Sequence, residues 1–484
     1  SIVLQNASMI SSDSFGAGQG GSISLHAGKD IRVLTDSYVV SDAYAGGNAG
    51  TIDIASQDLT IDGTGGKLLT QVSSQAFHDS TGDAGLIRIT TSDAVSLING
   101  GRVNTSTSGL GNAGDISVAA GTLLLDGTQN NGTGVFSTAD VYIDKSGVLF
   151  FNAGNAGTVN INVAGDAQIR GYARISSDTW SLGNGGNVNF KANSLLIDSM
   201  GNPSGAGITS EAALVSSGNG GSVTVDVAQH LQIGGLGFIS TTTLAPGNAG
   251  SVSVKAGQLT IDGKESGFAT IESSSSPIKG YSDISGNAGS VSVQVAGDVL
   301  LTGGGQIKSD TSSTGHGGDI KLVVGGHLDV QNAGAISTAT DGDGLGGSMN
   351  IQVGGDLNVA DNGQIRSTTR KDGNGGNIAI QVGGSLKVGA KGYIRSDSVA
   401  GTGQAGNIDI QASQVRMARG DVEALALITS DSTGAGSAGS INVRASKSIE
   451  LAEGSFITSD TYGGGNAGSL TVSAPDILIG GTGL

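Results

Sequence analysis

One recurring pattern constrains the fold of this chain more than any other feature. Gly-x-(Ala/Gly)-Gly, followed by alternating Ile or Val, occurs fifteen times in 484 residues. Successive final glycines are most often 29 residues apart, and the other spacings run from 30 to 43 residues. These final glycines are Gly21, Gly50, Gly85, Gly114, Gly157, Gly186, Gly221, Gly250, Gly289, Gly318, Gly347, Gly376, Gly406, Gly439 and Gly468. Self-similarity at a period of about 20–50 residues is the signature of repeat architectures, so we predict a solenoid with a base unit of 29 residues.

The unit between Gly289 and Gly318 shows what one repeat forms. Val291, Val293 and Val295 alternate with polar residues, and two further short alternating runs follow, each set off by Gly. The period of two indicates strands, and the absence of a 3.6-residue period excludes a helix. A single turn cannot bury its apolar faces, but stacked turns can. The sequence therefore predicts an all-β, right-handed parallel β-helix of about fifteen coils with three strands per coil.

We expect residues 1–484 to form a single β-helix rod, with a loop-bearing half at 1–289 and a more regular half at 290–484. Most inserts open just after the second strand, in every second unit. They begin at Asp62-Gly63, Asp126-Gly127, Asp198-Ser199 and Asp262-Gly263. Loops aligned along one edge of a solenoid are a common recognition surface. The alternative is that they are neutral insertions.

Composition argues against several classes of partner and site. A net charge of −17 argues against nucleic acid, because phosphate binding needs a basic footprint. The absence of Cys excludes thiol catalysis, thiolate metal sites and disulfides. No apolar run is long enough to predict a membrane span. We therefore expect neither a nucleic-acid partner nor a membrane span.

Aligning the repeats by their glycines turns sequence positions into columns. The second motif position is often Asn, which suits a turn with positive φ and can bond from coil to coil, so we predict a structural turn ladder. Its members are Asn48, Asn112, Asn155, Asn184, Asn219, Asn248, Asn287, Asn374 and Asn466. We expect this ladder to weaken where the position holds Asp83, His316, Leu345, Gln404 or Ser437.

A second column places Ser or Thr two residues after the aliphatic residue of the third strand, as in Ile394 and Ser396. Alternation points this hydroxyl inward, where we expect it to bond the backbone at a corner. Asp often follows, at Asp13, Asp42, Asp178, Asp310, Asp397, Asp431 and Asp460. Turn chemistry explains these carboxylates without a cofactor. The less favoured alternative is Ca²⁺, which needs six or more oxygens.

Basic and aromatic residues mark two candidate binding surfaces. A local basic face is predicted at Lys308, Arg366, Arg370, Lys371 and Arg395, which could hold sulfated or uronic glycans by charge or could be an ordinary solvated face. Phe15, Tyr44, Trp180 and Tyr462 all lie six residues before a motif glycine. They could stack on sugars, with Phe15 and Tyr44 as neighbours, or simply pack the turns.

No catalytic residues are predicted. The five His residues occupy mostly different contexts, and none of the hydrolase, metalloprotease, P-loop or dinucleotide motifs occurs with its structural context. Acidic residues recur at equivalent turn positions instead of breaking the repeat at one place. We therefore expect a protein that is not an enzyme.

The repeats Gly-Asn-Ala-Gly-Ser-Val-Ser-Val at 247–254 and Gly-Gly-Gln-Ile-Lys-Ser-Asp-Thr at 304–311 resemble those of filamentous-haemagglutinin-type exoproteins, the large adhesins of two-partner secretion systems. The resemblance implies a right-handed β-helical stalk and export across a Gram-negative outer membrane through a dedicated transporter. It also implies a role in adhesion, aggregation or biofilm matrix. The family's Asn-Pro-containing secretion signature is not visible, so this stretch is expected to be shaft.

Three functions follow as hypotheses. The first is a non-enzymatic extracellular structural and adhesive shaft that contacts glycans or proteins of host or neighbouring cells. The second is a filament subunit that stacks end to end with copies of itself, because neither end has an obvious cap. The third is a polysaccharide lyase or hydrolase built on a β-helix.

Overall fold

The structure is a computed structural model of the chain. It describes residues 1–129, 132–143, 146–151, 154–213, 216–244, 246–264, 268–276, 286–312, 314–419, 424–452 and 454–480. The chain forms an all-β parallel solenoid of about 16 turns with a period of about 29 residues, which confirms the predicted fold class. In the described residues no helix has the length and apolar character that crossing a bilayer requires.

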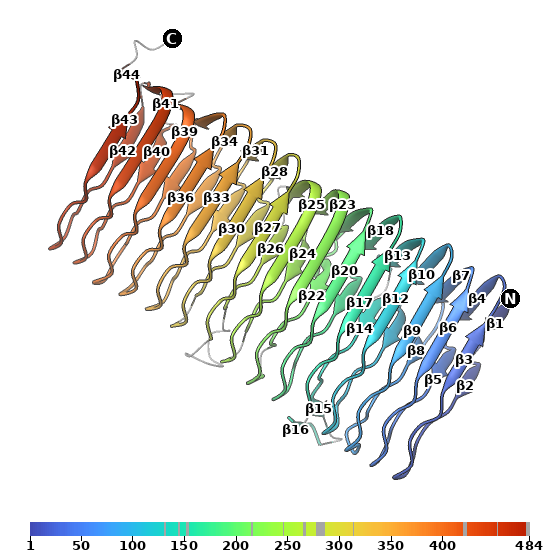
Figure 1. The fold of residues 1–484 in the computed structure, drawn as a ribbon. Coiled ribbons are helices and arrows are strands. Elements are labelled where there is room, and N and C mark those ends of the chain that lie inside the picture. Colours follow the sequence, from blue (N-terminus) through green and yellow to red (C-terminus); the bar gives the residue numbers. More distant parts are fainter. Residues whose placement is uncertain are drawn as a thin grey trace. The chain divides into compact units, whose positions relative to one another are not determined.

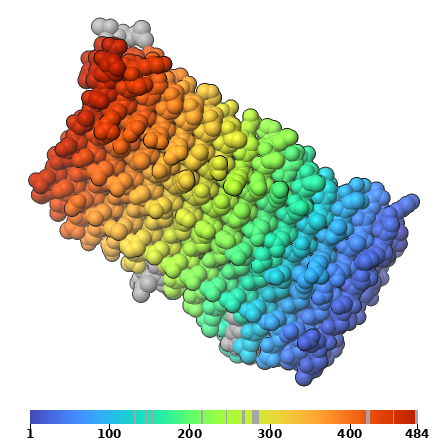
Figure 2. All heavy atoms as spheres, in the orientation of Figure 1, coloured from blue at the N-terminus to red at the C-terminus, as the bar shows by residue number. Residues whose placement is uncertain are grey.

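The contacts divide the chain into two units. Unit 1 comprises Ser1–Gln229 and Leu236–Ser251, and unit 2 comprises His230–Gly235 and Val252–Leu484. Each unit is described by itself. Within each, successive coils lie side by side as parallel ribbons in Figure 1 and as parallel bands of atoms in Figure 2.

The strands of unit 1 form three parallel ladders. First strands are β3 (Ile23–His26), β6 (Ile52–Ser56), β9 (Ile87–Thr91), β12 (Ile116–Ala120), β17 (Val159–Val163), β20 (Val188–Ala192) and the start of β23 (Val223–Gly234). Second strands are β1 (Ile2–Leu4), β4 (Asp30–Leu34), β7 (Asp58–Asp62), β10 (Ala94–Ile98), β13 (Thr122–Asp126), β18 (Asp166–Arg170) and β21 (Ser194–Asp198). Third strands are β2 (Met9–Ser11), β5 (Tyr38–Val40), β8 (Thr70–Ser73), β11 (Gly101–Asn104), β14 (Gly134–Phe136), β19 (Arg174–Ser176), β22 (Ala206–Thr209) and β24 (Gly237–Ser240).

Unit 2 repeats the plan. First strands are β27 (Val291–Val295), β30 (Ile320–Val324), β33 (Met349–Val353), β36 (Ile378–Val382) and β43 (Leu470–Ser473), and second strands are β28 (Val299–Thr302), β31 (Leu328–Val330), β34 (Leu357–Val359), β37 (Ser385–Val388) and β44 (Asp476–Ile479). Third strands are β26 (Thr270–Glu272), β29 (Gln306–Lys308), β32 (Ala335–Ser337), β35 (Gln364–Arg366), β38 (Tyr393–Arg395), β40 (Ala426–Thr429) and β42 (Ser455–Thr458). In four coils of the described residues the first and second strands run on as one, in β23 (Val223–Gly234), β25 (Val252–Asp262), β39 (Ile408–Met417) and β41 (Ile441–Leu451).

The register keeps like residues in columns. In unit 2, Ile307 pairs with Ile336, Ile336 with Ile365, and Ile365 with Ile394, each one coil further on. All four side chains are fully buried. Aliphatic side chains that stack on their own kind in this way bury the apolar face that no single coil could bury.

A fourth ladder follows the third strand in each coil. It consists of single bridge residues three places after the last residue of the third strand in most coils, such as Thr340, Thr369 and Ser398 in unit 2. Here the chain turns toward the next motif glycine. The glycine is required there because an added Cβ at Gly376 would lie 2.0 Å from the carbonyl oxygen of Gly347 in the coil before.

The inward hydroxyl column behaves as the alternation predicts. Ser396 Oγ donates to the carbonyl oxygen of Gly376 at 2.8 Å and accepts from the Gly406 amide at 3.1 Å. The same pair of bonds occurs at Ser74 in unit 1, with Gly50 and Gly85. These hydroxyls satisfy backbone groups at a corner where the strand ladder is interrupted, which buried peptide groups require.

Candidate binding groove

A corner groove runs along the outer face of the third strands in each unit. Three outward columns line it: the wall residue directly after the third-strand Ile or Val, the floor residue two places on, and the rim residue two further on. In unit 2, one coil contributes Arg366, Thr368 and Arg370, which alternate with the inward Ile365, Ser367 and Thr369. The groove is concave, because Thr368 is only 8% exposed although it points away from the interior.

Four of the predicted basic residues meet in one pocket of this groove in unit 2. Lys308, Arg366 and Arg395 supply the wall and Arg370 the rim of a cavity of about 190 Å³. Lys371, the fifth predicted residue, is exposed and does not line it. The cavity exists because the coil between Lys308 and Arg366 carries the small residues Ser337 and Ala339 in wall and floor, which leave room that their neighbours border.

Acidic and polar residues that sequence reasoning did not assign to this face complete the pocket. Lys308 Nζ lies 2.9 Å from Glu272 Oε2, and Arg370 forms an ion pair with Asp341. Ser337 Oγ donates to Asp310 Oδ1 at 2.6 Å and accepts from Arg366 Nε at 3.2 Å. Two of the four cations are therefore neutralised by direct ion pairs.

Burial sets the electrostatics of the pocket floor. It raises the pKa of Asp310, while the hydrogen bond from Ser337 and the charges of Arg366 and Lys308 act in the opposite direction. Burial also acts to lower the pKa of Lys308, but the charge and hydrogen bond of Glu272 and the charge of Asp310 together outweigh it, so the pKa of Lys308 is raised and the ammonium stays charged.

Three buried polar atoms of the pocket lining have no hydrogen-bond partner among the described residues. They are Arg395 Nε, Thr368 Oγ1 and Ser274 Oγ. The guanidinium of Arg395 lies 5.7 Å from the ring centre of Tyr393, which holds its plane in place. Within the described chain, neither Arg366 nor Arg395 forms an ion pair. The pocket thus offers donors that the protein itself leaves unused.

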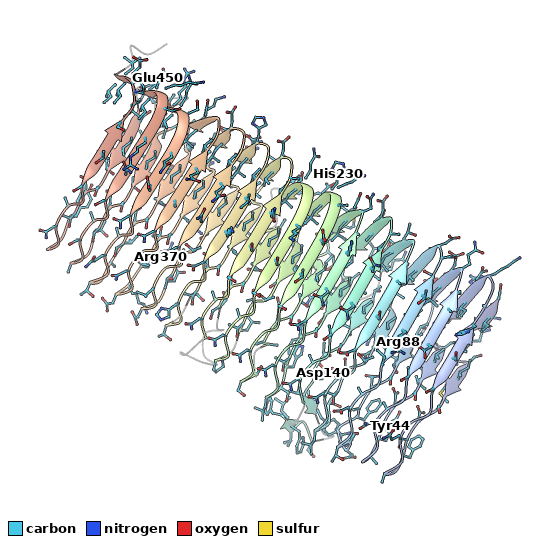
Figure 3. The ribbon with its side chains drawn as sticks, viewed as in Figure 1. Tyr44, Arg88, Asp140, His230, Arg370 and Glu450 are labelled. Carbon is cyan, nitrogen blue, oxygen red and sulfur yellow. The ribbon has the colours of Figure 1, made fainter. Side chains whose placement is uncertain are left out.

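The same groove in unit 1 carries aromatic rings on its rim. Phe15 stacks on Tyr44 with centroids 4.8 Å apart and planes 9° apart, and Tyr44 stacks on Phe77 at 4.6 Å and 6°. Tyr44 is labelled in Figure 3, as is Arg370 on the rim of unit 2. Both faces of Tyr44 are covered by its neighbours, so this ladder presents ring edges, whereas sugar stacking needs an open face.

The other predicted aromatics lie apart from this ladder. Trp180 is on the rim of unit 1, but Ser108 and Asp140 occupy the rim of the coils between it and Phe77. Tyr462 is on the rim of unit 2 and is 72% exposed. Phe77 was missed because it precedes its motif glycine by eight residues instead of six. Its place two residues after another outward position of the groove is the signal that could have found it.

Carboxylates are buried in the groove of unit 1. Burial raises the pKa of Asp42 to about 7, with the Gln75 amide acting to lower it and the charge of Asp13 adding to the rise. Burial likewise raises the pKa of Asp140 to about 6, against a hydrogen bond from Thr138. Asp42 accepts hydrogen bonds from the Gln75 amide at 2.8 Å and from Ser73 Oγ at 3.1 Å, so this column links coil to coil.

The predicted Asn residues also bond from coil to coil. In unit 1 the side-chain oxygens of Asn112, Asn155, Asn184 and Asn219 each accept the backbone amide of the Asn one coil on, at 2.8–2.9 Å. Asn48 accepts from Asp83, Asn287 from His316 and Asn374 from Gln404, while the amide of Asn466 donates to Ser437. The hydrogen bonds continue through Asp83, His316 and Ser437, where weakening was expected, because each supplies its own acceptor.

The inserts follow two patterns. After the second strand, the side chains of Asp62, Asp126, Asp198 and Asp262 each accept the amide two residues on, which closes a short turn. The longest spacing, between Gly114 and Gly157, holds its largest insert elsewhere. It includes the antiparallel pair β15 (Tyr142–Ile143) and β16 (Leu149–Phe150), which follows the bridge residue Ala139.

Among the described residues, no group of three or more His, Cys, Asp or Glu side chains is placed to hold a metal ion. Comparisons with models of protein families, with curated proteins and with solved structures gave no match for this chain. The function is therefore argued from the coil and its groove.

Proposed function

We propose that this chain is a non-enzymatic, extracellular structural and adhesive element, the shaft of a large secreted or surface-anchored adhesin. The observation that carries the proposal is the contrast between the interior and the outward face of each coil. Interior columns repeat with little change, whereas the outward groove changes from coil to coil. A scaffold of invariant geometry that presents variable contacts suits attachment.

Support for a stiff shaft comes from the coil-to-coil bonds. Each coil is tied to the next by strand ladders, by inward hydroxyls such as Ser396, and by side-chain ladders such as Asn155 to Asn184. Nearest-neighbour coupling of this kind stabilises a stack without long-range contacts. The sequence resemblance to two-partner secretion adhesins adds the route of export, through an outer-membrane transporter, and a role in attachment, aggregation or biofilm matrix.

The proposed contact is the basic pocket of unit 2, which would hold acidic glycans of host or neighbouring cells. To test attachment, the full chain is coated on beads and their retention is measured on surfaces bearing chondroitin sulfate, polygalacturonate or neutral dextran. Retention on at least one acidic surface, lowered by added salt, is the expected result. Equal retention on dextran, or none on any surface, would refute adhesion by this face.

One observation favours a second candidate, cleavage of a polysaccharide. Carboxyl groups with raised pKa values, the buried Asp42 and the half-buried Asp140, lie in the groove of unit 1, and perturbed acids are typical of catalytic sites. Release of reducing ends or unsaturated sugars from acidic polysaccharides, abolished by Asp140→Asn, would establish it in place of the first proposal.

A further inference from the structure

The pocket of unit 2 has the size and the chemistry of a site for one small charged group. Its volume of about 190 Å³ is below the range of about 300–1,000 Å³ that drug-sized ligands occupy. A whole sugar chain cannot enter it, but a single substituent of such a chain can. The inference that follows deepens the proposed function, on which it rests, by naming what the groove recognises.

The charges that remain after internal pairing are positive. Lys308 is paired with Glu272, and Arg370 with Asp341. Asp310 on the floor already accepts Ser337 Oγ at 2.6 Å and the Ala339 amide at 2.7 Å. Arg366 and Arg395 form no ion pair among the described residues, so the two guanidinium groups outweigh the single carboxyl of Asp310 and the pocket keeps a net positive charge.

The unused donors lie in the same cavity. Arg395 Nε and Thr368 Oγ1 are buried and have no partner among the described residues, although both residues line the pocket. A buried donor without an acceptor destabilises the folded state, so such a group calls for an explanation. An acceptor that enters from solvent supplies one, and guanidinium groups match planar or tetrahedral oxyanions by paired N–H bonds.

We propose that this pocket binds one oxyanion group, a sulfate, phosphate or carboxylate borne by a larger ligand, between Arg366 and Arg395. The small side chain of Ala339 leaves space in the pocket lining, and Thr368 contributes a hydroxyl at the floor. Arg370 and Asp341, which form an ion pair, also line the pocket. Selectivity for a single oxyanion comes from the limited volume, and affinity comes from the two guanidinium groups.

The test uses the full chain and three probes: sodium sulfate, inorganic phosphate and sodium glucuronate. Each is titrated calorimetrically at constant ionic strength, and the Nε–H resonances of the Arg side chains are followed by NMR. We expect saturable binding of at least one probe and a shift of the Arg395 resonance. Sulfate binding points to a sulfated ligand, glucuronate to a uronic acid, and phosphate to a phosphorylated one. No saturable binding of any probe overturns the proposal.

Two variants locate the site. Arg366→Gln with Arg395→Gln should weaken binding at least about tenfold, because charge-assisted bonds contribute about 1.5–3 kcal/mol each. The control, Lys321→Gln with Lys387→Gln, removes the same charge from exposed positions on β30 and β37 and should change binding less than about twofold. Equal weakening by the control would show unspecific attraction and overturn the site.

A third variant tests the cavity without changing any charge. Ala339→Leu fills the half-buried floor and should abolish probe binding, while circular dichroism shows that the strands are retained. If small-anion binding is absent while coated beads still attach, the pocket inference fails and the adhesive function stands. If the probes bind but no surface retains beads, the adhesive function fails and the pocket inference stands.

Discussion

The corner grooves of units 1 and 2 are built on the same coil but carry different chemistry. On the rim, unit 1 places Phe15, Tyr44 and Phe77 in one stacked ladder, whereas unit 2 places Asp341 and Arg370 in an ion pair at equivalent positions. In unit 1 three successive coils carry aromatic rings on the rim that stack on one another. Unit 2 leaves guanidinium groups beside an open cavity.

The interior shows no such difference. The third-strand column holds Val72 and Val103 in unit 1 and Ile336 and Ile365 in unit 2, all fully buried. Stacked aliphatic columns tolerate little else, because a neighbour lies directly above and below each side chain. The comparison teaches that the coil is specified from inside, which frees the groove to vary without loss of the fold.

The largest expected effect contrasts two adjacent residues. Ile365→Ala removes a fully buried side chain and should destabilise its part of unit 2 by about 2–5 kcal/mol. Arg366→Ala, on the groove wall, should cost less than about 1 kcal/mol. Hydrogen exchange of the amides in β32, β35 and β38 measures both. Similar losses of protection in the two variants would show that the groove also specifies the coil.

The second contrast between the units is the pH dependence of stability that their buried carboxyl groups cause. The folded-state pKa of Asp42 is raised to about 7, from an ordinary value of 3.8. The folded state therefore holds this proton more tightly than the unfolded state does. The stability that Asp42 contributes is fully present below about pH 4 and is lost as the pH rises through about 7.

Asp42→Asn keeps the shape but removes the charge. The variant should match the wild type near pH 4 and exceed its free energy of unfolding by about 2–4 kcal/mol at pH 8. Urea unfolding followed by circular dichroism from pH 4 to pH 8 measures this difference. Asp310→Asn in unit 2 should gain less, because Lys308 and Arg366 already favour the charged carboxylate there. A gain at Asp226, an exposed control on β23, would argue against burial as the cause.

The inward hydroxyl column should contribute equally to the stability of both units. Ser396→Ala leaves the carbonyl of Gly376 and the amide of Gly406 without their partner, at a cost of about 1–3 kcal/mol. Ser210→Ala should cost the same in unit 1, where the partners are the carbonyl of Gly186 and the amide of Gly221. Hydrogen exchange at the two glycines is the measurement. A marked difference between the units would refute the view that the same hydroxyl bonds stabilise the corner in both.

Most of the coil could be predicted from the sequence because its determinants are local and repeated. Alternation gives the inward face of each strand, and the glycine spacing gives the number of coils. The merging of first and second strands in β23, β25, β39 and β41 was not predicted. In the pairing of β39 with β41 the register shifts between Ala412 and Gln414, a local irregularity that alternation alone does not encode.

The groove was predicted only in part, because its contacts join residues from different coils. Lys308 was found, but its partner Glu272 lies 36 residues earlier instead of 29, since a longer unit intervenes. Phe77 was missed for the same reason, because its coil carries two more residues before the motif glycine. Counting residues from the motif glycines assigns the interior columns correctly. It assigns outward residues to the wrong column wherever an insert lies between them and the glycine.

The smallest expected effect compares the two rims directly. Tyr44→Ala removes both ring contacts of the unit 1 ladder, and an aromatic pair contributes about 0.5–1.5 kcal/mol beyond its buried area. Arg370→Ala removes an ion pair whose side chains are 57% and 47% exposed, which is worth about 0–1 kcal/mol. Thermal unfolding should therefore shift more for Tyr44→Ala, and only the Arg370→Ala difference should vanish in 1 M salt. Tyr44→Phe keeps the rings stacked and should behave as wild type. A loss that is larger at Arg370, or a Tyr44→Phe variant as unstable as Tyr44→Ala, would contradict a rim held by stacking in unit 1 and by weak surface charge in unit 2.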